Sequence, residues 1–270
     1  MIKSKRTLLA AVSIALVASL ALPANAMALV GNLKLSGSTT VQPTAQDLAN
    51  AFHRSNPSVN ITVAGGGSGI GIKDVEAGRV NIGMSSSVVG AADLAKGCVP
   101  YKIARDALTI IVNPGNPVKK LTSAQVKAIY TGKITNWKQV GGPNAAILAA
   151  GRDGASGTFS YFSSSILGGA RQSSKVKTYN ANGLVRNFVK ANKYGIGYVG
   201  MAYVNSSVKA LILDGTLPTR ANAMAGKYRY VRWLFFVTKS TAKGLSLIFI
   251  NYTLSKAGQA VVSKDYLPVK

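Results

Sequence analysis

A short apolar run that leads through a loop of Gly, Ser and Thr into a helical segment occurs three times in this chain of 270 residues. Apolar runs that alternate with amphipathic segments predict an α/β fold, because parallel strands are joined by helical crossovers. The first N–H groups of a helix lack an intrahelical partner and carry the positive end of its dipole. Such loops are suited to an anion. They comprise residues 36–40, 65–69 and 155–158.

The expected elements follow this alternation along the chain. The turn residues at 113–117 end an apolar strand and are predicted to mark a crossing between two domains. A stretch near the C-terminus has helical period from residue 245 to residue 262. We expect strands at 33–35, 60–63, 80–84, 106–112, 145–150, 195–199 and 228–237, and helices at 42–54, 123–130, 245–262 and directly after residue 158.

The N-terminus predicts export. Three basic residues among the first six precede a mostly apolar run at 8–22, which is followed by Pro23 and by small residues ending at Ala26. This three-part pattern is that of a signal peptide. The apolar run is shorter than the roughly 20 residues that span a membrane. We expect cleavage after Ala26, with Ala28 as a second site, and no lipid anchor, because no Cys follows the run.

Composition excludes several kinds of chemistry. The chain has one His and one Cys, so a disulfide framework, a Cys-based metal site and an H-E-x-x-H centre are excluded, and neither a metal nor a cofactor is expected. The formal net charge of +24 suggests a polyanionic partner. Since the Lys and Arg residues are scattered and lack interleaved aromatic residues, we expect no nucleic acid partner.

The spacing of the Gly, Ser and Lys residues does not match nucleotide-binding or hydrolase motifs. The glycines at 65–71 do not form G-x-G-x-x-G, and Gly132-Lys133 is followed by Ile134 where a P-loop requires Ser or Thr. No Ser in the Gly-rich loops is framed as G-x-S-x-G. The sequence therefore favours a binding site over a catalytic site.

Arg152 lies four residues before Ser156, at the start of the third loop. Its planar guanidinium can hold two oxygens of an oxyanion. For any single loop, an ordinary helix cap or a flexible linker is the simpler interpretation, and Arg152 could instead form an exposed salt bridge with Asp153. The three loops together with Arg152 favour an anion site.

In these features the chain resembles the phosphate-binding proteins of phosphate ABC transporters, which have the type II periplasmic-binding-protein fold. Two stretches are specific to that group as a pair: residues 131–137, and Arg152 with Ser156-Gly157-Thr158. The other matching stretches are residues 36–41, 65–69, 106–117, 121–122, 195–199, 254–255 and 258–259.

The resemblance implies a two-domain clamp in which each lobe is a mixed, mostly parallel sheet flanked by helices. It implies one lobe from 27–109 plus 233–270, which follows the signal peptide predicted at 1–26, another lobe from 110–232, and crossings near 107–112 and 228–236. The ligand positions of the family fall on Thr39, Thr40, Ser68, Arg152, Ser156, Gly157 and Thr158. Weaker candidates are Ser38, Gly69 and Ser86.

The chain departs from the family pattern after the strand expected at 80–84. Many relatives carry an acidic residue just before or after the Ile-Gly pair and an Arg after the paired serines, whereas this chain has Asn81, Ser85, Ser86 and Ser87. A carboxylate can accept the proton that phosphate carries and sulfate lacks. Selectivity for phosphate is thus implied by the resemblance more than by these residues.

The predicted function is an exported, monomeric, non-enzymatic binding protein. It would capture inorganic phosphate between two lobes and deliver it to an ABC transporter, with its permease and ATPase, in the membrane. Three alternatives remain open at this point: a binder of another tetrahedral oxyanion such as sulfate or arsenate, an extracellular phosphate-ester hydrolase or phosphate-scavenging surface protein, and a basic binder of nucleic acid or an anionic cell surface.

Overall fold

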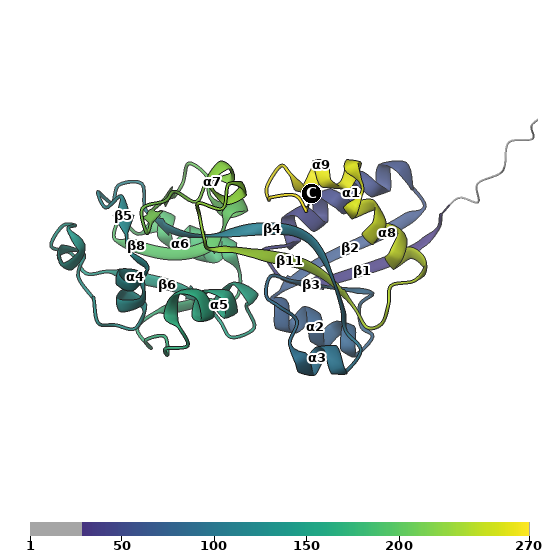
Figure 1. The fold of residues 1–270 in the computed structure, drawn as a ribbon, viewed down its shortest axis with the longest axis horizontal. Coiled ribbons are helices and arrows are strands. Elements are labelled where there is room, and N and C mark those ends of the chain that lie inside the picture. The colour runs from purple at the N-terminus through teal and green to yellow at the C-terminus, as the bar shows by residue number, and fades with distance from the viewer. Residues whose placement is uncertain (1–28, 270) are drawn as a thin grey trace, which may run out of the picture.

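Two bodies of helices and strands, joined by two long strands, make up the computed structural model, which describes residues 29–269 (Figure 1). The predicted signal peptide at 1–26 lies outside these residues. The joining strands are β4 (Val99–Val112) and β11 (Val231–Thr238), which pair with each other in antiparallel register. We call the body around β1 to β3 the first lobe and the body around β6 to β8 the second lobe.

A continuous sheet runs through both lobes in the order β2-β1-β3-β11-β4-β8-β6-β7. Strand β1 is parallel to β2 and β3, and β6 is parallel to β7 and β8, whereas β11 is antiparallel to β3, and β4 is antiparallel to β8. The bounds are β1 (Gly31–Gly37), β2 (Val59–Gly66), β3 (Ile82–Ser85), β6 (Leu148–Arg152), β7 (Lys177–Tyr179) and β8 (Gly195–Gly200). Short strands complete the second lobe: β5 (Lys120–Leu121), β9 (Lys209–Ala210) and β10 (Ile212–Leu213).

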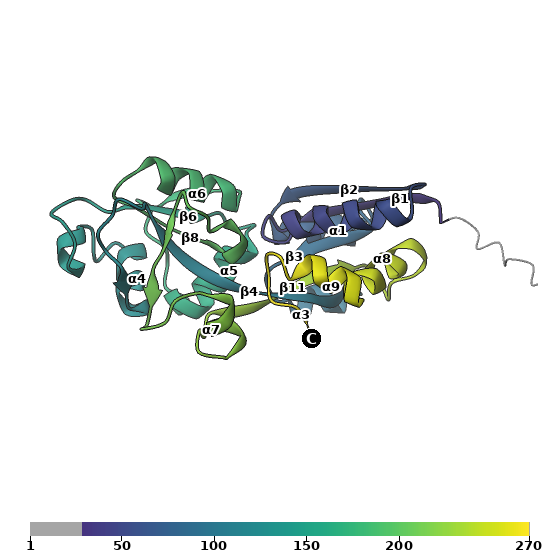
Figure 2. The same cartoon turned by 90° about the horizontal axis from the view of Figure 1, so that it is seen from above.

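Helices cover both faces of the sheet in the first lobe. Figures 1 and 2 show α1, α8 and α9 on one side of it and α2 and α3 on the other. In the second lobe the helices surround β6 and β8. The helices are α1 (Gln42–Ser55), α2 (Ser68–Glu76), α3 (Ala91–Ala95), α4 (Ser123–Tyr130), α5 (Gly157–Phe162), α6 (Asn182–Ala191), α7 (Arg220–Met224), α8 (Gly244–Leu254) and α9 (Lys256–Val262). Shorter turns are the 3-10 helices Trp137–Val140 and Met201–Tyr203 and the π-helix Ser163–Leu167.

Each lobe has its own hydrophobic core, and β4 contributes to both. Ile103 and Ala104 pack in the core of the first lobe, whereas Leu108 and Ile110 pack in that of the second. Between these pairs the strand carries two charged residues, Arg105 and Asp106. The change from one core to the other therefore takes place within a single strand. The lobe boundaries at residues 109 and 232 stay a prediction.

The predicted α/β alternation is confirmed, and most differences concern the ends of elements. Helix α4 has the predicted bounds, because Thr122 and Gln125 form a reciprocal capping box at its start. The single helix expected at 245–262 is wrong. The Ser255 hydroxyl instead accepts a hydrogen bond from Gly258 N and starts a new helix, α9, after α8 has ended.

Strand β4 begins at Val99, earlier than the strand expected at 106–112. Its first half pairs with β11, which the periodicity of residues 99–105 alone does not reveal. Among residues 29–269, no helix combines the length and the apolar character needed to cross a membrane.

Replacing Gly258 by Ala should destabilise the packing of α9 on α8. A Cβ at this position would collide with the Tyr252 and Thr253 carbonyl oxygens, the second at 2.6 Å. We expect Gly258→Ala to lower the free energy of unfolding by about 1–3 kcal/mol, as overpacking does, measured by urea denaturation. Gly154→Ala is the matched control, because its Cβ would meet no atom within 4 Å. Equal unfolding midpoints for the two variants would contradict this account.

Candidate functional site

The first Gly/Ser/Thr loop links β1 to α1 and buries its hydroxyl side chains. Ser38 Oγ accepts hydrogen bonds from the backbone N–H groups of Thr40 and Val41, at 3.2 and 3.4 Å. This turn places Thr39 and Thr40 in the interior, where both are buried. Gly37 permits the close approach, because its φ is +130° and a Cβ there would meet Gly71 Cα at 2.9 Å.

The second loop links β2 to α2 and contacts the end of β3. Ser68 is buried in the first turn of α2, and its Oγ accepts a hydrogen bond from Ser86 N at 3.0 Å. The Ser86 hydroxyl lies 3.4 Å from that of Ser68. Two small hydroxyl side chains from separate segments of the first lobe are thereby adjacent.

The third loop links β6 to α5 and meets the second loop across the two lobes. Ser156 Oγ caps α5 by accepting from Phe159 N at 3.2 Å. Gly69 N donates to Ala155 O at 3.0 Å, so the two loops are in direct contact. A Cβ on Gly157 would collide with Ser68 Oγ and lie 2.8 Å from Ser86 Oγ. Only a glycine allows this approach of the lobes.

Arg152 at the end of β6 is buried, with 2% of its surface exposed. Its Nε donates to Tyr179 O at 3.0 Å and its Nη2 to Asn180 O at 2.8 Å. Among residues 29–269, no group accepts a hydrogen bond from the buried Nη1. Burial lowers the pKa of Arg152 to about 10, which leaves the guanidinium charged at neutral pH.

The exposed Arg152–Asp153 salt bridge considered from the sequence is wrong. Arg152 is buried, and within the described residues it makes no ion pair with Asp153. The guanidinium is held by backbone carbonyls instead. Its charge is therefore not neutralised by a carboxylate in direct contact.

Hydroxyl groups from the two lobes also contact each other directly. Thr40 Oγ1, before α1, lies 3.0 Å from Thr158 Oγ1 in α5. Asn182, at the start of α6, donates from Nδ2 to the hydroxyls of Thr39 and Thr40, at 3.1 and 3.0 Å. Tyr266 donates to Thr40 O at 2.6 Å. The lobes are thus closed on each other at this cluster.

A buried ion pair stands beside these hydroxyls, at the crossing between the lobes. Arg232 on β11 donates from Nε and Nη2 to Asp106 Oδ2 on β4, at 3.0 and 2.8 Å. Arg232 also donates from Nη1 to Gly157 O at 3.1 Å. Sequence reasoning missed Asp106, Arg232 and Asn182 as members of the site. The signal available for two of them was a charged residue within a mostly apolar strand segment: Asp106 is the one charged residue of the strand expected at 106–112, and Arg232 is one of two Arg residues in the strand expected at 228–237.

The predicted positions can be compared with this geometry. Contacts within the cluster bring together Thr39, Thr40, Ser68, Gly157 and Thr158, as well as the weaker candidate Ser86. The remaining predicted positions, Ser38, Gly69, Arg152 and Ser156, shape or support the loops that carry the cluster. Whether each binds a ligand stays a prediction.

Of the four positions that depart from the family pattern, Ser86 and Ser87 lie at the cluster, Ser85 donates from its hydroxyl to Ser87 O at 2.8 Å, and Asn81 lies elsewhere. A Cβ on Gly157 would be 2.9 Å from Ser87 N, so Ser86 and Ser87 both face the third loop. Asn81 instead accepts from Lys34 N at an exposed position of the first lobe. Within residues 29–269, no group of three or more His, Cys, Asp and Glu side chains is arranged to hold a metal ion.

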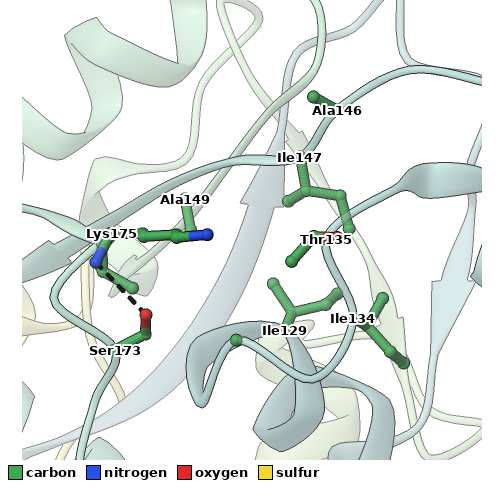
Figure 3. A pocket seen from close by; sticks show the side chains of 10 residues that line it. Ile129, Ile134, Thr135, Ala146, Ile147, Ala149, Ser173 and Lys175 are labelled. Atoms are coloured by element: carbon green, nitrogen blue, oxygen red, sulfur yellow. Dashed lines mark hydrogen bonds between the residues drawn. The ribbon is translucent and has the colours of Figure 1, made fainter.

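Figure 3 shows a separate pocket in the second lobe. It has a volume of about 250 Å³ and is lined mainly by apolar side chains, including Ile129, Ile134 and Ile147. Gly132, Ile134 and Thr135 come from the stretch at 131–137 that is typical of the resembled family. None of the clustered hydroxyl residues lines this pocket. The stretch is therefore part of the second lobe's structure and lies outside the hydroxyl cluster.

Comparison with known proteins agrees with the fold. The family described as the PBP superfamily domain matches residues 23–257. The phosphate-binding protein PstS of Bacillus subtilis is 33% identical over 244 residues, which cover 88% of this chain and 81% of that protein. PstS of Borreliella burgdorferi is 28% identical and covers 88% of this chain and 90% of its own length.

Solved structures give the same result. A substrate-binding protein from Clostridium perfringens, solved with bound phosphate, has a TM-score of 0.86 and 34% identity, covering 89% of this chain and all of that one. An ABC-type phosphate transport receptor from Vibrio cholerae has a TM-score of 0.73 and 29% identity, covering 88% and 100%. The predicted type II fold and family resemblance are confirmed. The chain therefore belongs to the PBP superfamily and, within it, to the family of phosphate-binding proteins.

Proposed function

We propose that this protein is an exported binding protein that captures inorganic phosphate between its lobes and delivers it to an ABC transporter. The observation that carries the proposal is Arg152 Nη1, a charged donor that is buried and has no acceptor among the described residues. A buried donor of this kind is costly unless a ligand satisfies it. An oxyanion supplies both the acceptor and the compensating charge.

The surrounding groups fit a small tetrahedral anion. The hydroxyls of Ser68 and Thr158 are buried where the two lobes meet, and each can donate one hydrogen bond. The loops before α1 and α2 add backbone N–H groups at helix starts. A substrate with several oxygens at short spacing can use donors from both lobes at once.

Binding and release follow from the contact between the lobes. In this closed arrangement the second and third loops touch through Gly69 and Ala155. Closure removes the anion from water and strengthens its interaction with the donors. Opening at the β4–β11 crossing would release phosphate to the permease and ATPase of the transporter. We expect the protein to act as a monomer, without a cofactor or nucleic acid.

Family membership supports a role in binding, because this is a family of substrate-binding proteins. The signal peptide predicted at 1–26 is consistent with a place outside the cytoplasm, where such a protein meets its transporter. Sulfate and arsenate remain the competing ligands that binding experiments must separate. Turnover of an aryl phosphate ester by the pure protein would instead favour the hydrolase alternative.

Removing the Arg152 side chain should abolish most of the phosphate affinity. Hydrogen bonds to charged groups contribute about 1.5–3 kcal/mol, which corresponds to roughly 10- to 150-fold in Kd. We expect this loss for Arg152→Ala by isothermal titration of ligand-free protein with phosphate, and we expect weaker binding of sulfate to the unaltered protein. Arg171→Ala is the control, since it removes the same charge from an exposed position of the second lobe.

Two results would contradict the proposal. One is a phosphate affinity of the unaltered protein no better than millimolar. The other is unchanged binding by Arg152→Ala, with circular dichroism showing that the variant is folded. The second result would remove Arg152 from the site even if phosphate remains the ligand.

Adding one methyl group at Gly157 should prevent the lobes from closing. Its Cβ would collide with Ser68 Oγ and crowd Ser86 Oγ, both on the opposite lobe. We expect Gly157→Ala to weaken phosphate binding at least about tenfold, the effect of losing one or more hydrogen bonds. Small-angle scattering with phosphate present should show a larger radius of gyration than for the unaltered protein.

Gly154→Ala, three residues away in an open position, should behave like the unaltered protein. A compact, tightly binding Gly157→Ala would show that closure does not need this contact.

Salt dependence should separate a buried phosphate site from a polyanion-binding surface. A protein held on nucleic acid by many phosphate contacts loses about a thousandfold or more in affinity between 50 and 200 mM salt. A site whose donors are buried is screened much less. We therefore expect phosphate binding to weaken only slightly over this range in the same titrations. A loss as steep as that of a nucleic-acid binder would indicate that the anion binds at the basic surface.

A further inference from the structure

Asp106 and Arg232 form a cross-strand pair at the one place where both joining strands change from one core to the other. They are direct partners in the antiparallel register of β4 and β11. Arg232 has 5% of its surface exposed and Asp106 has none, and the two are joined at 2.8 Å. A buried ion pair is weak evidence for added stability, because desolvation offsets the attraction. Its position and its remaining hydrogen bonds point to another role.

The donors of Arg232 extend beyond Asp106 to groups of both lobes. Nη2 carries two protons and lies near three acceptors: Asp106 Oδ2, Thr158 Oγ1 at 3.1 Å and Thr40 Oγ1 at 3.3 Å. One Nη2 proton forms a hydrogen bond with the carboxylate of Asp106, and the other is shared between the hydroxyls of Thr40 and Thr158. Asp106 Oδ1 is occupied by Met201 N at 2.9 Å. The carboxylate thus holds the guanidinium against the two threonines.

The hydroxyl protons can be assigned from this arrangement. Thr40 Oγ1 accepts from Arg232 Nη2 and from Asn182 Nδ2, so its two lone pairs are in use and its own proton goes to Thr158. Thr158 Oγ1 then accepts from Thr40 and from Arg232. Among the contacts described for residues 29–269, nothing accepts the Thr158 proton. That proton is left to donate to a ligand.

We propose that Arg232, held by Asp106, is a positioning residue that keeps Thr158 a hydrogen-bond donor and thereby selects the dianion of phosphate over the monoanion. This inference rests on the proposed function. The dianion presents three unprotonated oxygens to the donors of the site, whereas the monoanion presents two. The monoanion has a second hydroxyl that can face Thr158. The proton of that hydroxyl and the proton of Thr158 would then point at each other, because Thr158 has no free lone pair to accept a hydrogen bond.

A phosphate group loses its second proton between about pH 5 and pH 8. We therefore ask which protein groups near Arg232 also change charge in this range. Arg152 of β6 has a pKa of about 10, lowered first by burial and slightly by Arg232. Tyr161 of α5 packs its ring against the guanidinium at 5.6 Å. Burial raises the pKa of Tyr161 and also those of Tyr203 and Tyr266. None of these four groups changes charge in that range.

The test replaces both members of the pair by neutral residues of similar shape. The double variant Asp106→Asn/Arg232→Gln keeps the net charge of the protein. Because the Gln side chain can accept as well as donate hydrogen bonds, Thr158 is no longer restricted to donating its proton to the ligand. We expect phosphate affinity at about pH 8 to fall at least about tenfold, as when a charged hydrogen bond is lost. The affinity at about pH 5 should fall less, so that the ratio of the two affinities decreases. Urea denaturation checks that the variant is folded.

Two further variants separate positioning from structure. Glu76→Gln/Lys96→Gln removes an exposed ion pair of the first lobe and should leave both affinities unchanged. Arg232→Lys keeps a charged donor, should fold even if the double variant does not, and should retain part of the preference for the dianion. An equal loss of affinity at both pH values in the folded Arg232 variants would overturn the inference. If the unaltered protein binds no phosphate at either pH, the proposed function fails first.

Discussion

Charged groups that are removed from water must be paired, and the two lobes close around three such groups: Arg152, Asp106 and Arg232. The opposite charges of Asp106 and Arg232, at the strand crossing, neutralise each other. Arg152 is held by carbonyl dipoles and keeps a net charge, with one donor unused among the described residues. The closed arrangement is thus electrostatically incomplete until an anion is present. This difference between a self-neutral pair and an uncompensated guanidinium supports the proposal that the site takes a negatively charged ligand.

The crossing strands connect this electrostatic arrangement to the motion of the lobes. Because β4 and β11 pair with each other and contribute to both cores, a change of their twist would move one core relative to the other. The Asp106–Arg232 pair lies within that segment and contacts the hydroxyls of Thr40 and Thr158, one from each lobe. Lobe closure and the strand crossing therefore share the same few hydrogen bonds, at the place where we propose that the ligand binds. Among residues 29–269, Arg152 and Arg232 are the basic residues that are buried.

Much of the hydroxyl cluster could be predicted because its members are local in sequence. Thr39, Ser68 and Thr158 each lie in a Gly/Ser/Thr loop between a strand and a helix, and such loops are visible without a structure. Asp106 and Arg232 could not be paired in this way, since 126 residues separate them and only the strand register makes them neighbours. The break between α8 and α9 was missed for a similar reason: periodicity continues across Ser255, while the cap and the close packing of Gly258 end the first helix.

The sequence by itself determined the alternation of strands and helices, the three loops and the family, because these depend on short-range periodicity, turn chemistry and matching motifs. Only the tertiary structure decided which hydroxyls touch, that Arg152 is buried without a carboxylate partner among residues 29–269, and that a cross-strand ion pair lies against the hydroxyls of Thr40 and Thr158. The physical reason is that hydrogen-bond direction depends on how many donors and acceptors surround a group. That environment is assembled from residues that are distant in the chain and become neighbours only when the lobes close.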